Sequence, residues 1–235
     1  QYLTEHKIKL IDSESEKNTT KFSISISGSD RTLKLENECD PIEYSNLDAD
    51  GHIVSPIFHE ISDDVFKKIK SDSNFLFVDP QGFLRQKDSN GNVILKKTDL
   101  DLSDVNAIKI NPEEGQNIVS GSHDEMMLAL QKKGIEYVLL TNKVDVSLLV
   151  KNRVYSLKLP NKTVHDTTGI GDIFCSAFTC TMLKEKDFLW ALCFAAGSAQ
   201  AALESNNVGL QKIPKKGMVE NNASYFYNLV DFRDL

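Results

Sequence analysis

The segment from Val164 to Phe174, Val-His-Asp-Thr-Thr-Gly-Ile-Gly-Asp-Ile-Phe, holds residue types that could bind an anion and move a proton. It lies just before an apolar stretch with helical periodicity. Gly169 and Gly171 let the backbone turn sharply, so that successive N–H groups point at one place at the positive end of the helix dipole, where anions bind. Asp172, beside that place, is either a general base or an ordinary acidic residue of the first helical turn.

Polar residues also follow two apolar runs elsewhere in the chain. Asp79 comes directly after 75–78, where a ligand crevice lies in open α/β sheets, although Asp before Pro is also a common turn. The sequence Asn111-Pro112-Glu113-Glu114 follows 107–110 and has the order of an N-cap, a first-position proline and an acidic first turn. Arg85 could reach a substrate or phosphate oxygen, or form a surface ion pair.

The elements that must position these residues alternate between strand and helix from Gly51 onward. Continuous apolar strands that alternate with helices imply a parallel sheet with helices on both faces. The periodicity predicts strands at 52–56, 75–78, 107–110, 137–141, 145–150 and 153–159, and helices at 62–69, from 112, and at 122–133, 173–184, 187–204 and 218–229.

The first part of the chain has a different pattern, with apolar residues at alternate positions between Lys21 and Leu35. These residues flank the turn Gly28-Ser29-Asp30, which predicts a hairpin with one apolar face. A free two-stranded hairpin is marginal in water, so this one needs a partner surface. We therefore expect a β-ribbon subdomain over residues 1–45 and a three-layer αβα domain over residues 46–235.

Composition excludes several classes of function. The 235 residues carry a formal charge of −7 with scattered lysines, so nucleic acid is not an expected partner. The chain has no apolar run of the length that a membrane-spanning helix needs. Its 4 cysteines form no Cys-x-x-Cys pair and its 5 histidines show no metal-ligand spacing, so we expect a cytoplasmic protein without structural zinc.

The string from Asp166 to Phe174 closely resembles the second signature of the PfkB/ribokinase family of small-molecule kinases, Asp-Thr-x-Gly-Ala-Gly-Asp-x-Phe, with Ile170 in place of the alanine. Three further segments agree in order. The segment Phe77–Arg85 is similar to a strand end of archaeal-type members, Asn111-x-x-Glu114 to the family's Asn-x-x-Glu motif, and Asn18–Arg31 to its lid ribbon. The resemblance covers nearly the whole chain and implies an α/β, ribokinase-like αβα sandwich with a small β-ribbon lid.

The resemblance implies phosphoryl transfer from ATP, assisted by Mg²⁺, to a hydroxyl of a sugar, polyol or nucleoside. Asp172 matches the catalytic base, and Glu114 with Asn111 matches the pair that organises the magnesium-bound triphosphate through water. A fixed carboxylate beside a helix N-terminus suits this chemistry, because phosphoryl transfer depends on alignment and charge neutralisation. The anion hole of the family is matched by the backbone N–H groups of Gly169, Ile170 and Gly171.

Weaker matches extend the site. Asp166 and Thr168 match positions that bind a monovalent cation such as K⁺ in many members, with a simple Asx turn as the alternative. Gly209 falls where the family places part of the adenine pocket, and is also an expected helix stop. Thr141 and Asn142 fall near the nucleotide, but the usual Gly-x-x-Gly turn after this strand is missing, which predicts a changed nucleotide site.

Two further expectations follow from the resemblance. The family's first strand and its Gly-Gly sugar signature are not found, so we expect residues upstream of Gln1 to carry much of the specificity. Lid ribbons of the family often pair between subunits, which predicts a homodimer. The missing Gly-x-x-Gly turn leaves a rival hypothesis, a weak or inactive member that only binds nucleotide or sugar, but the retention of Asp172 and Glu114 favours an active kinase.

Overall fold

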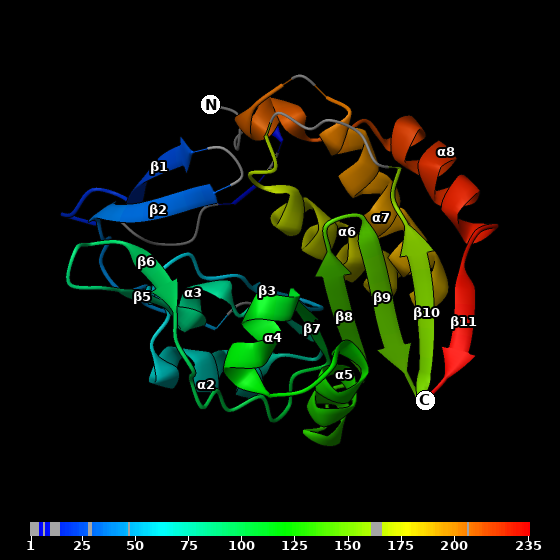
Figure 1. Cartoon of the computed structure of the whole chain (residues 1–235), viewed down its shortest axis with the longest axis horizontal. Helices are drawn as coiled ribbons and strands as arrows, with labels where there is room; N and C mark the ends of the chain where they lie inside the picture. The colour runs from blue at the N-terminus through cyan, green and yellow to red at the C-terminus, as the bar shows by residue number, and fades with distance from the viewer. Residues whose placement is uncertain are drawn as a thin grey trace.

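A mixed sheet forms the centre of the computed structural model, which describes residues 5–6, 8–9, 15–27, 30–46, 48–160, 166–205 and 207–235 (Figure 1). The sheet has 7 strands in the order β11-β10-β9-β8-β7-β4-β3. In chain order these are β3 (His52–Val54), β4 (Leu76–Val78), β7 (Ala107–Ile110), β8 (Tyr137–Asn142), β9 (Asp145–Val150), β10 (Arg153–Lys158) and β11 (Asp231–Asp234).

The expected parallel sheet is correct for one half of the molecule only. Strands β3, β4, β7 and β8 run parallel, whereas β9, β10 and β11 each pair antiparallel. Tight turns explain the direction of β9 and β10, because a parallel pair needs a long crossover and a hairpin does not. Lys151 and Asn152 join β9 to β10 at φ values of 47° and 63°, the left-handed geometry that two-residue hairpins use.

Helices cover both faces of the sheet, as expected from the sequence (Figure 1). In β4, Leu76 and Val78 belong to the core cluster on one face and Phe77 to the cluster on the other, as the alternation of a strand requires. The first face packs on α2 (Asp63–Asp72), α4 (Pro112–Ile118) and α5 (His123–Lys132), and the second on α6 (Ile170–Glu185), α7 (Phe188–Leu203) and α8 (Lys216–Tyr227).

Local capping chemistry determines where several helices begin. The side chain of Ser122 accepts a hydrogen bond from the Glu125 N–H while Glu125 accepts one from the Ser122 N–H, so α5 begins at His123, one residue after its predicted start. Helix α6 begins three residues earlier than predicted, because Gly169 adopts a φ of 79° and serves as its N-cap. Asp172 consequently lies within the first turn of α6.

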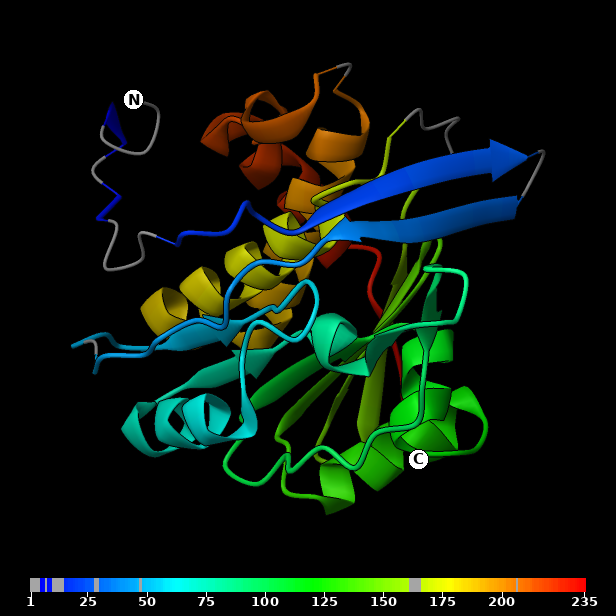
Figure 2. The same cartoon turned by 90° about the vertical axis from the view of Figure 1, so that its left-hand side faces the viewer.

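The predicted hairpin is present as a separate two-stranded sheet, β1 (Lys21–Ser27) and β2 (Asp30–Asn37), which we call the ribbon. Figure 2 shows it extending away from the αβα body. Phe22 lies opposite Leu35 and Ile24 opposite Leu33, so these four share one face. Gly28 and Ser29 of the predicted turn, and the side chain of Ile26, lie outside the described residues.

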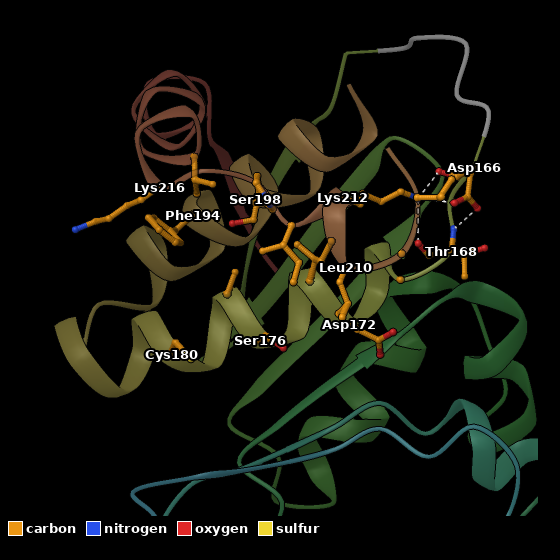
Figure 3. A pocket seen from close by; sticks show the side chains of 18 residues that line it. Asp166, Thr168, Asp172, Ser176, Cys180, Phe194, Ser198, Leu210, Lys212 and Lys216 are labelled. Carbon is orange, nitrogen blue, oxygen red and sulfur yellow. Dashed lines mark hydrogen bonds and ion pairs between the residues drawn. The ribbon is translucent and has the colours of Figure 1, made fainter. Parts of the chain in front are cut away.

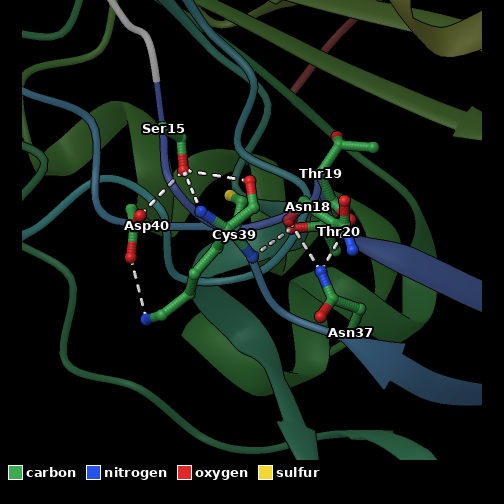
Figure 4. A network of polar contacts seen from close by, with 8 residues as sticks. Ser15, Asn18, Thr19, Thr20, Asn37, Cys39 and Asp40 are labelled. Carbon is green, nitrogen blue, oxygen red and sulfur yellow. Dashed lines mark hydrogen bonds and ion pairs between the residues drawn. The ribbon is translucent and has the colours of Figure 1, made fainter.

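The base of the ribbon is attached to the body. Leu35 is buried, its N–H donates to the Gly91 carbonyl at 3.0 Å, and the Phe22 ring packs on Phe58. A polar network fixes the chain on either side (Figure 4): the Asn37 amide donates to the carbonyls of Asn18 and Thr19 at 2.6 and 2.9 Å. Gly91 belongs to the turn of a hairpin that the sequence did not predict, β5 (Arg85–Lys87) and β6 (Val93–Leu95).

Close packing also fixes the short helix α3 (Gln81–Leu84). A Cβ atom on Gly82 would lie 2.3 Å from the backbone carbon and oxygen of Pro56, a distance that no side chain tolerates. The segment that follows β3 and the helix that follows β4 are therefore held in direct backbone contact. Among the described residues, no helix is both long and apolar enough to cross a membrane.

Candidate active site

The carboxyl ends of β3, β4 and β7 meet at one edge of the sheet, where they place Ser55, Asp79 and Asn111. The Nζ of Lys109, near the end of β7, lies 2.6 Å from the Asp79 Oδ2, and both side chains are buried. A Cβ atom on Gly171 would lie 3.4 Å from the Lys109 Nζ and 3.6 Å from the Asp79 Oδ2. The fold thus brings Asp79 and the glycine-rich signature together, with Lys109 between them.

Lys109 supplies a permanent positive charge at this edge. Burial alone would lower the pKa of its ammonium, but the carboxylates of Asp79 and Glu114 outweigh that effect and hold the pKa above its usual value. Burial of Glu114 raises the pKa of its carboxyl, with Asp79 acting in the same direction and Lys109 against it. Lys109, Asp79 and Glu114 therefore interact electrostatically with one another, and the ammonium group of Lys109 faces the Gly171 turn.

Asn111 and Glu114 form a capping box at the start of α4, which confirms the N-cap and acidic first turn that their order in the sequence predicts. The Glu114 N–H donates to the Asn111 Oδ1, and the Asn111 N–H to the Glu114 Oε2, each at 2.8 Å. From the part of the chain that the structure describes, the other carboxylate oxygen, Oε1, receives only a 3.4 Å contact from the Gln81 amide. Glu114 therefore keeps acceptor capacity on one oxygen while the other holds α4 in place.

Asp172 lies in the first turn of α6, where one of its carboxylate oxygens accepts a hydrogen bond from the Ser55 hydroxyl at 3.1 Å. Its side chain is exposed. Of the three N–H groups predicted to form the anion hole, that of Ile170 donates to the Thr167 carbonyl at 3.3 Å. A ligand at this helix end would have to replace that long bond.

A cavity of about 870 Å³ opens beside Asp172 and Gly169 (Figure 3). Its polar end adjoins the glycine turn, and Gly209 is among the residues that line the cavity. The remainder is largely apolar, which suits a flat ring system better than a purely charged ligand. The apolar side chains come from α6, α7, α8, the 3₁₀ turn η1 (Gly209–Lys212) and the residues that flank η1, and include Ala177, Phe194, Val208, Leu210, Ile213 and Val219.

The polar end of the cavity holds an ion pair that the sequence did not predict. The Lys212 Nζ donates to the Asp166 Oδ2 at 2.7 Å, to the Asp166 carbonyl at 3.0 Å and to the Thr168 carbonyl at 3.1 Å. Hydrogen bonds from Lys212 and Thr168 hold the pKa of the Asp166 carboxyl well below its usual range. The two residues predicted to bind K⁺ are therefore both engaged by the ammonium group of Lys212.

Other predicted residues lie outside this cluster. Thr141 and Asn142 end β8 and do not line the cavity among the described residues; the left-handed φ of 54° in the following turn belongs to Lys143. Arg85 donates to the Ile57 carbonyl at 3.1 Å and stacks 5.4 Å from the Phe22 ring, so the structure places it at the base of the ribbon.

Sequence reasoning also missed Ser55, Lys109 and Lys212. Lys109 carries a signal, because a lysine in the otherwise apolar run 107–110 must find a partner when that strand is buried. Lys212 carries none, since Gln-Lys-Ile-Pro-Lys-Lys is what an exposed loop looks like. Ser55 looks like an ordinary strand end.

The protein is a small-molecule kinase with a ribokinase-like fold. Its αβα sandwich has a mixed sheet, and its α6 has a glycine N-cap and an aspartate in the first turn. The family model described as pfkB family carbohydrate kinase matches residues 15–216, and the chain belongs to this family.

Solved structures show the same fold. A pyrophosphate-dependent kinase in the ribokinase family, complexed with a pyrophosphate analogue and myo-inositol, matches at 20% identity and a TM-score of 0.78, over 93% of this chain and 79% of that one. The ribokinase of Thermotoga maritima matches at 15% identity and 0.67, and that of Arabidopsis thaliana with ribose and ATP at 18% and 0.64, each over 88% of this chain and 70% of theirs. No curated protein sequence matches this chain.

Proposed function

We propose that this kinase transfers the γ-phosphoryl group of ATP to a hydroxyl of a sugar, polyol or nucleoside, with Asp172 as the general base. The observation that carries the proposal is the position of Asp172, held by Ser55 in the first turn of α6 at the mouth of the cavity. A binding protein without turnover has no use for a base at that point.

The chemistry follows from the groups present. The Asp172 carboxylate takes the proton of the acceptor hydroxyl as its oxygen bonds to the γ-phosphorus. The bond from that phosphorus to the bridging oxygen breaks, and its electron pair leaves with ADP. The N–H groups of Gly169 and Gly171, at the positive end of α6, neutralise charge on the transferring group, and the buried ammonium of Lys109 adds to their field.

ATP is the donor that the cavity supports. Its apolar walls offer a surface on which a nucleobase can stack, and Gly169 and Asp172 at its polar end place the phosphates beside the acceptor. Inorganic pyrophosphate is the second candidate, because three matching structures are described as pyrophosphate-dependent kinases or variants of one. Pyrophosphate would leave the apolar part of the cavity without a ligand.

The deciding experiment supplies labelled ATP or pyrophosphate to a panel of sugars, inositols and nucleosides. We expect phosphorylated product with ATP, and competitive inhibition by adenosine, which occupies the apolar cavity without phosphates. Turnover with pyrophosphate alone, unaffected by adenosine, would contradict the choice of donor but not the kinase. Binding of ATP with no phosphorylation of any acceptor would favour the inactive-binder hypothesis.

Magnesium fits this site as an ion carried mainly by the donor. The described residues form no cluster of three or more metal-binding side chains, and Mg²⁺ prefers substrate phosphates and water to an all-protein cage. Glu114 retains acceptor capacity on Oε1 and is the residue that would reach the ion through water. When bound, the ion would neutralise phosphate charge.

Replacing Glu114 with glutamine should raise the Mg²⁺ concentration required for half-maximal rate, because the variant loses the carboxylate charge. Glutamine also completes capping boxes, so α4 should persist. The matched control is Glu125→Gln, which changes the same position of the capping box of α5, far from the site in sequence. A magnesium titration decides the point: identical curves for both variants would leave Glu114 as a cap only.

We also propose a lid formed by residues 1–45 over the 46–235 body, and a homodimer through the ribbon. Phe22 and Leu35, at the base of the apolar face, pack on the body, whereas Ile24 on the same face is 47% exposed. An exposed apolar part of a ribbon favours pairing with a second copy. Sedimentation at micromolar concentration should show a dimer, and Ile24→Lys should dissociate it; a monomeric wild-type protein would contradict this prediction.

A cytoplasmic location is consistent with the free state of all 4 cysteines, which is what a reducing compartment maintains.

A further inference from the structure

Lys212 holds the segment that leads into the phosphoryl-transfer site. Its side chain is 2% exposed, and its ammonium group finds three acceptors, all on Asp166 and Thr168. A buried ammonium has three protons to place, and here each has a partner. Asp166 in turn accepts the Thr168 N–H at 2.9 Å, so the segment is fixed both by its own turn and by Lys212 (Figure 3).

Fixing these carbonyls orients the N–H groups that follow them. The described chain has no cis peptide bond, so each carbonyl and the next N–H point in opposite directions. Because the Thr168 carbonyl is bound to the Lys212 Nζ, the Gly169 N–H is turned away from Lys212. Gly169 is the N-cap of α6 and lines the cavity beside Asp172. Lys212 thus controls the direction of one N–H group of the proposed anion hole.

The same oxygens are those expected to bind a monovalent cation. A free ion there would have to displace a covalently attached one and would be repelled by its charge at close range. An attached cation also needs no binding step, since its local concentration is set by the chain. Lys212 ends η1, the turn whose Gly209 and Leu210 line the cavity, so it also joins the cavity wall to the phosphoryl site.

We propose that Lys212 is a built-in cation that replaces a free monovalent ion and positions the 166–169 segment for phosphoryl transfer, so that the enzyme works without potassium. This inference rests on the proposed kinase function. Lys212 acts through Thr168 and Gly169 rather than on the reacting atoms, and it is therefore a positioning residue.

The first test measures the wild-type rate in KCl, NaCl and tetramethylammonium chloride at equal ionic strength, and we expect the three rates to agree within about twofold. Lys212→Ala opens a cation-sized space. In tetramethylammonium its kcat should fall by about 10²-fold, the usual effect of misplacing a reacting group by about 1 Å. Ammonium or K⁺, which can enter the space, should restore much of the rate, whereas tetramethylammonium is too large.

The control is Lys215→Ala, an exposed lysine three residues further on that does not line the cavity. It should keep the wild-type rate in all salts. A wild-type enzyme that requires K⁺, or Lys212→Ala at full rate in tetramethylammonium, would overturn the proposal.

A second measurement does not depend on turnover. Thermal unfolding of Lys212→Ala should shift upward in NH₄⁺ or K⁺ relative to tetramethylammonium, because a ligand of the native state stabilises it, while the wild-type protein should show no such preference. This shift would stand even if the donor or acceptor were wrongly chosen. If Lys212→Ala does not fold, Lys212→Met keeps the apolar stem and should be slow without rescue. Failure of both variants to fold, or full activity of the methionine variant, would overturn the positioning role.

Discussion

Asp172→Asn should lower kcat by about 10²- to 10⁴-fold, the usual worth of a positioned general base, and leave the affinity for ATP nearly unchanged. Asparagine has the same shape and can still accept the Ser55 hydrogen bond, so the first turn of α6 should keep its geometry. What the variant loses is the ability to take the acceptor's proton. Pre-steady-state turnover together with ATP titration separates the two effects.

The matched control is Asp187→Asn at the N-cap of α7, where the carboxylate accepts the N–H groups of Leu189 and Trp190. Asparagine caps helices about as well as aspartate, so this variant should turn over at the wild-type rate. If Asp172→Asn also turned over at the wild-type rate, Asp172 would be a first-turn acid and the proposed mechanism would be wrong.

Shortening the ribbon should collapse phosphorylation of the acceptor while slow hydrolysis of ATP continues. A γ-phosphoryl beside Gly169 can pass to water as readily as to a sugar hydroxyl unless the site is closed when transfer occurs. The variant replaces residues 23–34 with a two-glycine turn. It keeps Phe22 and Leu35, which lie opposite each other and pack on the body, so the base of the ribbon should remain attached.

The decisive measurement follows ADP and phosphorylated product in the same reaction. Wild-type protein should give one product molecule for each ADP, and the shortened variant should give mostly ADP. An unchanged thermal unfolding temperature controls for damage to the body. Tight one-to-one coupling in the shortened variant would show that the ribbon is not the lid.

Local signals in the sequence predicted many element positions correctly. β7 and β9 have the predicted bounds, and α5 lies within one residue of its predicted bounds, because apolar runs and a serine–glutamate capping box act within a few residues. The shared face of Phe22, Ile24, Leu33 and Leu35 also follows from alternation, but the register does not, because Asp30, which was predicted in the turn, is the first residue of β2 and pairs with Ser27. The αβα class is also confirmed. It could be predicted because runs of buried strand residues separated by helices leave few other arrangements.

Long-range pairing accounts for most of what the sequence did not predict. The direction of β9 and β10 depends on two tight turns, and β11 is an exposed edge strand with little apolar patterning. The Lys109–Asp79 contact joins residues 30 positions apart, and the Lys212–Asp166 contact joins residues 46 positions apart. Each lysine side chain contacts its partner only after the sheet and helices have assembled, so the spacing of residues along the chain does not predict either contact.

Backbone contact at Gly82 has a consequence for how this protein can diverge. Any side chain there would have to push Pro56 aside, and Ser55, which holds Asp172, precedes that proline directly. Homologues that retain activity should therefore retain glycine at this position even where the sequences of neighbouring loops change. A map of evolutionary variation would then mark Gly82 as strongly as it marks a ligand-binding residue, although its selection arises entirely from the shape of the polypeptide backbone.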